Sequence, residues 1–161
     1  NPTSTPTVPG PPGDPEPTKT PTGKPTNPPQ PPPPPEADGD MTGDELDLFN
    51  RIDSARKSKG CAPLEQDAPV TYGARNEADR RSESGEVEAH GASWSAAGGD
   101  NWSSDEAFDR MMRESRDTVL NCGLDTLGVG RETQRYCGSL PVLGVCLSGW
   151  KTRVSWVADF D

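Results

Sequence analysis

Hydrophobic residues are nearly absent from the start of the chain, and after it they recur first at helical and then at strand spacing. Residues 44–60 repeat large apolar side chains every three or four positions, with carboxylates in the first turn, lysines in the last and a glycine at the end. Residues 68–84 repeat smaller apolar side chains in the same way. Ser103 and Glu106 match a capping box, which opens a third stretch of helical spacing as far as Leu120. We therefore predict three helices.

Strand-like patterns follow the helices. Branched and aromatic residues begin a strand at 126–130, and the same composition continues at 140–146 and 151–160. Residues 85–101, in contrast, are mainly glycine, alanine, serine and tryptophan without a period, so we expect a loop there. Helices come first and strands last, with no repeating βαβ alternation. This order predicts an α+β domain in which helices pack on an antiparallel sheet.

Proline separates the chain into two parts. Of the 19 prolines, 16 lie in residues 1–40, and this segment has no apolar side chain larger than that of Val8. Such a sequence cannot form a core, and proline favours an extended polyproline II chain. We predict that residues 1–40 are a disordered Pro/Thr-rich spacer, which holds a single domain of residues 41–161 away from a membrane or through a cell wall. A ligand for proline-recognition domains is the alternative.

Charge excludes some partners. The formal net charge is −10, and the basic clusters, Arg80 with Arg81 and Arg110 with Arg113 and Arg116, are interleaved with carboxylates. Because phosphate binding needs clustered cations, this argues against nucleic acid or anionic lipid as the main partner. We interpret both clusters as solvated helix faces.

The four cysteines all lie in the domain, where they predict disulfides. A zinc site is the competing use, but the chain has no CxxC pair and only one histidine. Four cysteines allow three pairings, and the sequence alone does not choose among them. Cys137 and Cys146 fit a short link between neighbouring strands, which would leave Cys61 to pair with Cys122. Two disulfides in a small acidic domain indicate an oxidising compartment and therefore export.

Two further features bear on location. The chain begins with Asn1 rather than methionine, so we interpret it as a mature or truncated chain in which no leader is expected. No stretch approaches 18 apolar residues, so none is expected to cross a membrane. We expect an extracellular or cell-envelope protein, either secreted or lipid-anchored.

Several short segments of the domain resemble the CAP superfamily, which contains the cysteine-rich secretory, venom-allergen and plant pathogenesis-related proteins. They occur in the family's order and spacing over essentially all of residues 41–161, and they resemble bacterial, actinobacterial members most. The segments are Leu48-Phe49-Asn50 with Arg56, Gly60-Cys61-Ala62-Pro63-Leu64, Gly99-Asp100-Asn101, Val119-Leu120-Asn121 with Leu127-Gly128-Val129-Gly130, and Trp156-Val157-Ala158-Asp159-Phe160.

The resemblance implies an α-β-α sandwich with a central antiparallel sheet, export, and a cavity built from two histidines and two acidic residues. It also implies a disulfide between Cys61 and Cys122, as in actinobacterial members. His90 matches the first histidine, Asp100 stands in place of a glutamate, and Glu114 matches the second acid. The second histidine is missing or replaced by Ser115. One imidazole with two carboxylates is a poor set for a divalent metal, so we expect no metal and no cofactor.

Aromatic and sulfur-containing side chains complete the predicted site and core. Trp94 and Trp102 flank the candidate cleft, where aromatic rings commonly bind glycans or apolar ligands. The predicted ligand-binding set is therefore His90, Trp94, Asp100, Trp102 and Glu114. The side chains of Trp150, Trp156, Met111 and Met112 are expected in the core.

Three functions fit this sequence. The first is a non-catalytic binding or structural module that recognises a lipid, glycan or protein, in which His90 hydrogen-bonds Asp100 or Glu114 and holds its loop in place. The second is an extracellular hydrolase that uses His90 with Asp100 or Glu114 and with Ser115 as nucleophile, although the sequence has no nucleophile elbow. In the third, the domain only caps the spacer. We expect a monomer.

Overall fold

The structure, a computed structural model, describes residues 39–161, so residues 1–38 of the expected spacer lie outside the described residues. Four helices and five strands make up the domain. In chain order they are α1 (Gly43–Lys59), β1 (Glu65–Gln66), α2 (Ala68–Ser84), β2 (Ala89–His90), β3 (Trp94–Asp100), α3 (Ser104–Glu114), α4 (Arg116–Val119), β4 (Thr126–Cys137) and β5 (Trp150–Phe160). Within residues 39–161, no helix combines the length and the apolar character needed to cross a bilayer.

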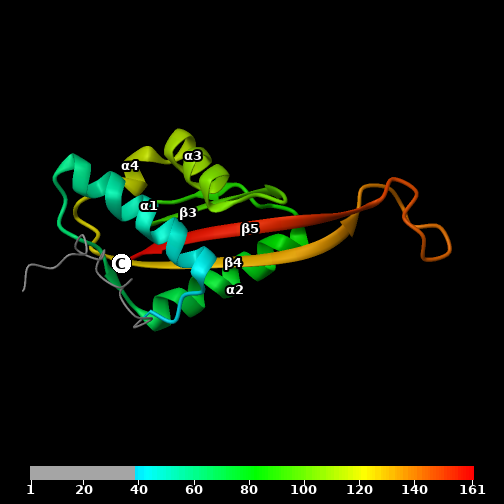
Figure 1. Ribbon diagram of the computed structural model, residues 1–161, viewed down its shortest axis with the longest axis horizontal. Coiled ribbons are helices and arrows are strands. Elements are labelled where there is room, and N and C mark those ends of the chain that lie inside the picture. The colour runs from blue at the N-terminus through cyan, green and yellow to red at the C-terminus, as the bar shows by residue number, and fades with distance from the viewer. Residues whose placement is uncertain (1–38) are drawn as a thin grey trace, which may run out of the picture. The chain divides into compact units, whose positions relative to one another are not determined.

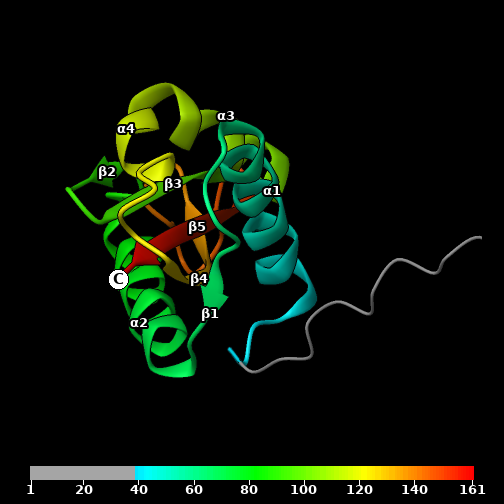
Figure 2. The ribbon, with the colours of Figure 1, turned by 90° about the vertical axis from the view of Figure 1, so that its left-hand side faces the viewer.

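The strands form one sheet between two helical layers. Their order is β1-β4-β5-β3-β2, and every neighbouring pair is antiparallel except the short pair of β1 with β4. Figures 1 and 2 show α2 against one face, while α1, α3 and α4 cover the other. The predicted α+β class is confirmed, with the helices and sheet layered as expected.

Capping residues account for the accurate helix boundaries. The side chain of Thr42 accepts from the N–H of Glu45, whose carboxylate accepts from the N–H of Thr42, and Gly60 ends α1 in the left-handed region. The side chain of Asp67 accepts from the N–H of Val70 at the start of α2, and Gly85 ends this helix at a positive φ. These signals are local, so the sequence predicted both helices to within a residue.

Two predicted segments are wrong. Residues 85–101 are not one loop, because they contain β2 and β3, and β3 lies in the interior of the sheet. Residues 140–146 are not a strand but a series of turns with a single bridge between Val142 and Val145. In the first segment small residues pack between two covered faces, where no polar alternation is needed. In the second, the sequence has the apolar composition of a strand, but its apolar side chains are largely exposed.

The third predicted helix divides into two. The helix that begins after Ser103 ends at Glu114, and α4 adds one more turn from Arg116 to Val119. Ser115 separates them with a φ of −140°, outside the helical range. Ser115 is therefore a buried junction residue, not a residue within a polar helix.

Glycines in β4 let α2 approach the sheet closely. A Cβ atom on Gly128 would lie 2.4 Å from the backbone nitrogen of Thr71, and one on Gly130 would lie 2.3 Å from that of Arg75. The alternate residues Leu127 and Val129 point to the other face and are fully buried. The Leu-Gly-Val-Gly pattern is thus explained by one face that packs large side chains and one that admits a helix backbone.

The larger core lies between the sheet and the α1, α3 and α4 layer. Trp156 and Met111 are buried in it as predicted, and Met112 packs against its edge. Trp150 was expected in the core, but its side chain is 48% exposed because it begins β5 beyond the cover of the helices. A smaller cluster of alanines with Val157 fills the space beneath α2.

Both disulfides have the expected pairing, Cys61 with Cys122 and Cys137 with Cys146. The first ties the segment after α1 to the segment after α4. The second joins the last residue of β4 to the loop that leads to β5, so it closes a loop instead of linking two strands.

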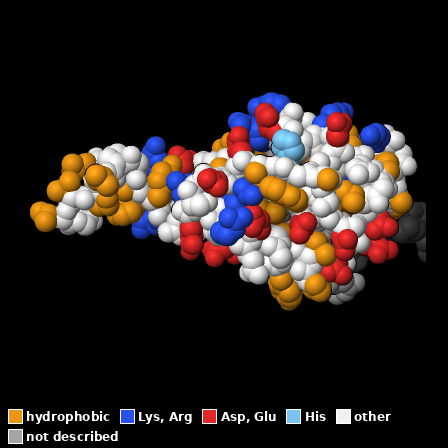
Figure 3. All heavy atoms as spheres, turned by 180° about the vertical axis from the view of Figure 1, so that it is seen from behind, with side chains coloured by type: hydrophobic (Ala, Val, Ile, Leu, Met, Phe, Trp, Pro, Cys, Tyr) orange, Lys and Arg blue, Asp and Glu red, His pale blue; other side chains and the backbone are white. Residues whose placement is uncertain are grey.

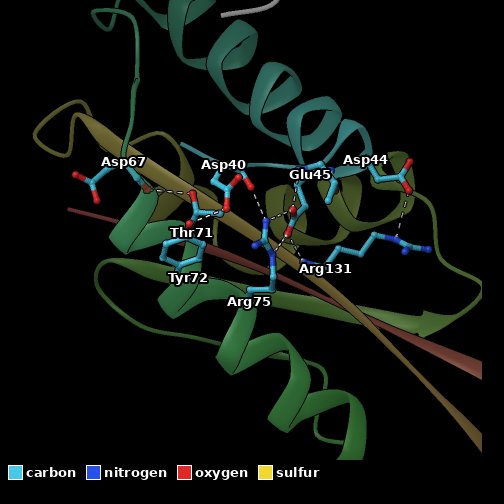
Figure 4. A network of polar contacts seen from close by, with 9 residues as sticks. Asp40, Asp44, Glu45, Asp67, Thr71, Tyr72, Arg75 and Arg131 are labelled. Atoms are coloured by element: carbon cyan, nitrogen blue, oxygen red, sulfur yellow. Dashed lines mark hydrogen bonds and ion pairs between the residues drawn. The ribbon is translucent and has the colours of Figure 1, made fainter. Parts of the chain in front are cut away.

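A buried carboxylate connects both helical layers to the sheet (Figure 4). Glu45 has no exposed surface, and it accepts hydrogen bonds from Arg75 Nη2 at 2.6 Å and Nε at 3.1 Å. The backbone N–H groups of Thr42 and Arg131 donate to it at 2.8 and 3.0 Å. Because α1 and α2 lie on opposite faces, Glu45 joins them around the edge of β4, where the short β1 leaves the strand unpaired beyond Leu127.

The surroundings of Glu45 favour its ionised form. Burial raises the pKa of the Glu45 carboxyl. The hydrogen bonds from Arg75, Thr42 and Arg131, together with the charge of Arg75, lower the pKa by more than burial raises it, so the pKa is lowered overall. A lowered folded-state pKa means that ionisation stabilises the fold above the ordinary glutamate pKa of 4.5. This stabilisation is lost as the pH falls through the folded-state value.

Replacement of the cysteines should rank the two disulfides. We expect Cys61→Ala with Cys122→Ala to lower the free energy of unfolding by about 4 kcal/mol and Cys137→Ala with Cys146→Ala by about 3 kcal/mol, because the first closes the longer loop. Urea unfolding of the two double variants measures both. A larger loss from the second pair would contradict this account.

Removal of the Glu45 charge should destabilise the domain in a pH-dependent way. We expect Glu45→Gln to cost about 2–3 kcal/mol at neutral pH, because Arg75 loses its buried partner. The difference from the native chain should shrink in acid, where Glu45 itself becomes protonated. Urea unfolding across the acid range tests this. Glu106→Gln, which changes the exposed capping box of α3, is the matched control and should cost less than about 1 kcal/mol.

Candidate functional site

His90 lies at an open pocket of about 390 Å³ beside α3. Figure 3 shows this exposed histidine, in pale blue, among acidic and basic side chains on one face of the domain. The pocket is lined by Glu88, Ala89, His90, Ser95, Ala96, Arg110 and Glu114. Of the predicted site residues, His90 and Glu114 are therefore brought together.

Two elements position these side chains. His90 pairs with Ser95 in the antiparallel ladder of β2 and β3, so both point to the same face of the sheet. Helix α3 crosses that face, and it carries Arg110 and Glu114 four residues apart, on one side of the helix. The pocket thus has one wall from a sheet edge and one from a helix.

Arg110 has two side-chain partners at this pocket. Its guanidinium forms an ion pair with Glu88, and it lies over the ring of Trp102 with its carbon 5.2 Å from the ring centre. Among the described residues, no side chain hydrogen-bonds the His90 ring or the Glu114 carboxylate. The expected hydrogen bond from His90 to Asp100 or Glu114 is therefore not present here. Arg110 is therefore engaged by other side chains, while His90 and Glu114 remain available to a ligand.

Ser115 follows the pocket residue Glu114 in the sequence, but its side chain does not line the pocket. Its hydroxyl donates to the carbonyl of Met111 at 3.0 Å, and it lies 2.6 Å from the hydroxyl of Ser95. The side chain is buried, with 5% of the residue exposed. This arrangement fixes the junction of α3 and α4 on β3, and it leaves the hydroxyl without a direct contact to His90.

Asp100 lies at the other end of β3. It is five residues beyond Ser95, the partner of His90, which corresponds to about 17 Å along a strand. An odd number of residues also turns its side chain to the opposite face. There it accepts a hydrogen bond from the Tyr136 hydroxyl and lies 3.8 Å from Lys151 Nζ. The structure thus separates Asp100 from the His90 pocket.

The two tryptophans predicted to flank one cleft lie on opposite faces. Trp102 packs on the larger core beside α3, and its carbonyl accepts from Trp156 Nε1 at 3.1 Å. Trp94 packs instead with the small cluster beneath α2. Neither ring lines the His90 pocket, and Trp102 contacts Arg110 of its lining.

Trp94 belongs to a second pocket of about 420 Å³, which is lined by Gly73, Glu77, Arg80, Arg81, Trp94, Val157 and Asp159. Arg81 was predicted to lie on a solvated face, but it is buried and stacks 4.9 Å from the Trp94 ring centre. Arg80 is exposed, as expected. Burial, with Asp161 and Glu77 nearby, raises the pKa of Asp159.

Sequence reasoning missed Glu88, Ser95 and Arg110 as members of the His90 pocket. The spacing of Arg110 and Glu114 was a usable signal, because residues four apart share a helix face. Ser95 gave none, since its role depends on the register of a strand that was not predicted. Within residues 39–161, no group of three or more His, Cys, Asp or Glu side chains is arranged to hold a metal ion.

A comparison with solved structures shows a likeness of fold to one pathogenesis-related protein. The crystal structure of MpPR-1i, a pathogenesis-related protein, matches this chain with a TM-score of 0.51 at 15% sequence identity, over 75% of this chain and 90% of the other. No family model matches the sequence, and no curated protein matches it. The likeness is therefore one of fold, and the expected bacterial origin stays a prediction.

Loss of the Ser115 hydroxyl should destabilise the domain. We expect Ser115→Ala to lower the free energy of unfolding by about 1–2 kcal/mol, because the Ser95 hydroxyl then loses its buried neighbour. Ser95→Ala should cost a similar amount, and the double variant less than the sum of the two. Urea unfolding of all three variants measures this cycle. Additive losses would mean that the two hydroxyls do not interact.

Proposed function

We propose that residues 39–161 form a non-catalytic binding module of the cell exterior, which recognises a glycan in the His90 pocket. The observation that carries this proposal is that one side of the pocket is formed by Arg110, which already has partners, while two other polar side chains of the lining have none within residues 39–161. Arg110 is held by Glu88 and Trp102, while His90 and Glu114 have no hydrogen-bond partner among the described residues.

The chemistry of the lining favours a sugar over an acyl chain. Carboxylates, an imidazole and a guanidinium can together accept from and donate to several hydroxyl groups. The only apolar members of the lining are the small side chains of Ala89 and Ala96, which offer little surface to a lipid tail. A lipid or a protein partner, the other ligands considered from the sequence, finds less support at this pocket.

Hydrolysis is the competing function, and it has weaker support. A nucleophilic serine needs a base within hydrogen-bond reach, whereas the Ser115 hydroxyl is engaged by Met111 and Ser95. Asp100 could orient His90 only from the far end of β3. Glu114 is the one predicted acid beside His90, and the predicted nucleophile Ser115 is not among the residues that line the pocket.

An exterior location is part of the proposal. All four cysteines are paired, which fits an oxidising compartment. The proline-rich residues 1–40 are proposed to serve as a spacer between this domain and a cell envelope, and attachment through a lipid is one form this could take.

The test is a titration with oligosaccharides followed by two reporters. His90 is the only histidine, so its ring resonances are assigned without ambiguity. The second reporter is tryptophan fluorescence, which includes that of Trp102 in contact with Arg110 and is compared with the fluorescence of a Trp102→Phe variant. With chitotriose, maltotriose and oligogalacturonate as probes, we expect one to shift both signals. His90→Ala and Glu114→Gln should each weaken that binding at least roughly tenfold, as expected for loss of a polar contact in a site.

Glu83→Gln is the matched control, because Glu83 is an exposed carboxylate on α2 outside the pocket. The Glu83→Gln variant should bind the oligosaccharide with the same affinity as the native chain. If no oligosaccharide shifts the His90 resonances, the glycan proposal is wrong. Turnover of a nitrophenyl ester or glycoside that depends on His90 would instead establish the hydrolase.

A further inference from the structure

The loop between β4 and β5 carries a group of apolar side chains that nothing in the domain covers. Leu143 is 99% exposed, Leu140 88% and Leu147 76%. Val142, Val145 and Trp150 are each about half exposed. Figure 1 shows this loop beyond the helices at the end of the long hairpin, and Figure 3 shows hydrophobic atoms gathered there. We call residues 138–150 the hairpin tip.

Exposed apolar groups on this scale mark an interaction surface. Here they occur on a convex projection, whereas the His90 pocket and the Trp94 pocket are lined mainly by polar residues. A protein partner would need a groove that fits around the tip. A lipid bilayer needs no such shape, because it accepts an apolar projection of any outline.

Charge follows the pattern of a segment that enters a membrane interface. The net charge of −10 argues against anionic lipid as a partner of the domain as a whole, but residues 138–150 contain no charged side chain. Arg135 and Lys151 follow directly behind the tip on the two strands, and Arg135 stacks 5.4 Å from the ring centre of Trp150. Apolar residues, then a tryptophan, then cations is the order from acyl chains through the interface to anionic headgroups.

Some polar groups of the tip are already paired within it. Val142 and Val145 exchange two backbone hydrogen bonds of 3.0 and 2.9 Å, and the N–H of Gly149 donates to Cys146. The hydroxyl of Ser139 donates to that of Ser148 at 3.2 Å. Groups that are already paired cost less to remove from water.

Leu143 occupies a position that the fold itself does not require to be leucine. Its φ is 53°, in the left-handed region where asparagine or glycine is more favourable, and its side chain touches almost nothing. The domain gains no packing from this residue and bears a backbone cost for it. A leucine that is unfavourable in the isolated domain is explained if it binds something outside it.

We propose that the hairpin tip inserts into the surface of a bilayer that contains anionic lipids. Leu140, Leu143 and Leu147 enter the boundary of the acyl chains, Trp150 lies at the interface, and Arg135 with Lys151 contacts the headgroups. Insertion of this kind is shallow and reversible. The loop closed by Cys137 and Cys146 enters already folded, so little conformational entropy is lost on binding. This inference is independent of the ligand of the His90 pocket.

Flotation of the full 161-residue chain with vesicles tests the proposal. Vesicles of phosphatidylcholine mixed equally with phosphatidylglycerol should carry the protein upward, and vesicles of phosphatidylcholine alone should bind it several-fold less. Leu140→Ser and Leu143→Asn should each weaken binding roughly tenfold. Asparagine suits the left-handed conformation at residue 143, so the turn should persist. Unchanged thermal unfolding verifies that the variants fold.

The aromatic residues offer a matched pair. Trp150 in the tip and Tyr72 on α2 are each 48% exposed, so Trp150→Ser should reduce flotation while Tyr72→Ser should not. For the cations, Lys151→Gln should weaken binding to anionic vesicles, whereas the exposed Arg113→Gln on α3 should leave it unchanged.

Three outcomes would overturn the proposal. The native chain could fail to float with either vesicle, or the leucine variants could float as well as the native chain. Light scattering could also reveal a dimer that Leu143→Asn dissociates, in the absence of vesicle binding. In that case the tip would be a contact between two copies of this chain.

Discussion

The carboxylate of Glu45 is the interaction on which the rest of the sandwich depends. A buried charge is costly unless every oxygen is bound, and here a guanidinium and two backbone N–H groups provide that binding. Each donor comes from a different part of the fold, because Thr42 precedes α1, Arg75 lies on α2 and Arg131 lies on β4. The position of both helical layers along the sheet is thereby set by one side chain.

The glycines of β4 follow from the same arrangement. With Arg75 held at Glu45, the backbone of α2 lies so close to the sheet that Gly128 and Gly130 leave no room for a Cβ atom. The intervening Val129 points to the opposite face and packs in the larger core. A short motif that resembles a family signature thus has a local physical cause, which is the tight contact of one helix with one strand.

The sequence predicted those elements whose signals are local. Helical spacing and the closing glycines located α1 and α2, and the four cysteines pair as expected. Strand β3 was missed because alanine, glycine and serine suit a strand covered on both faces but show no alternation. The segment 140–146 misled for the opposite reason, since its apolar residues are exposed and serve no core.

The sequence predicted some of the residues of the candidate site but not how they are arranged in space. His90 and Glu114 meet at one pocket, but Asp100 and Trp94 are directed elsewhere by the two-residue period of β3. No sequence pattern available here specified which residues of that strand share a face with His90. Ser115 has the side chain of a nucleophile and the contacts of a structural hydroxyl, and only its neighbours distinguish the two.

The length of the β4–β5 hairpin is separable from the stability of the domain. From Thr133 to Cys137 no residue of β4 is buried, so this part of the ladder contributes nothing to either core. Addition or removal of two residues in each strand would keep every side chain on its original face and move the end of the hairpin by about 7 Å. Reach can therefore change in discrete steps during evolution, while the helices and the sheet beneath them stay the same.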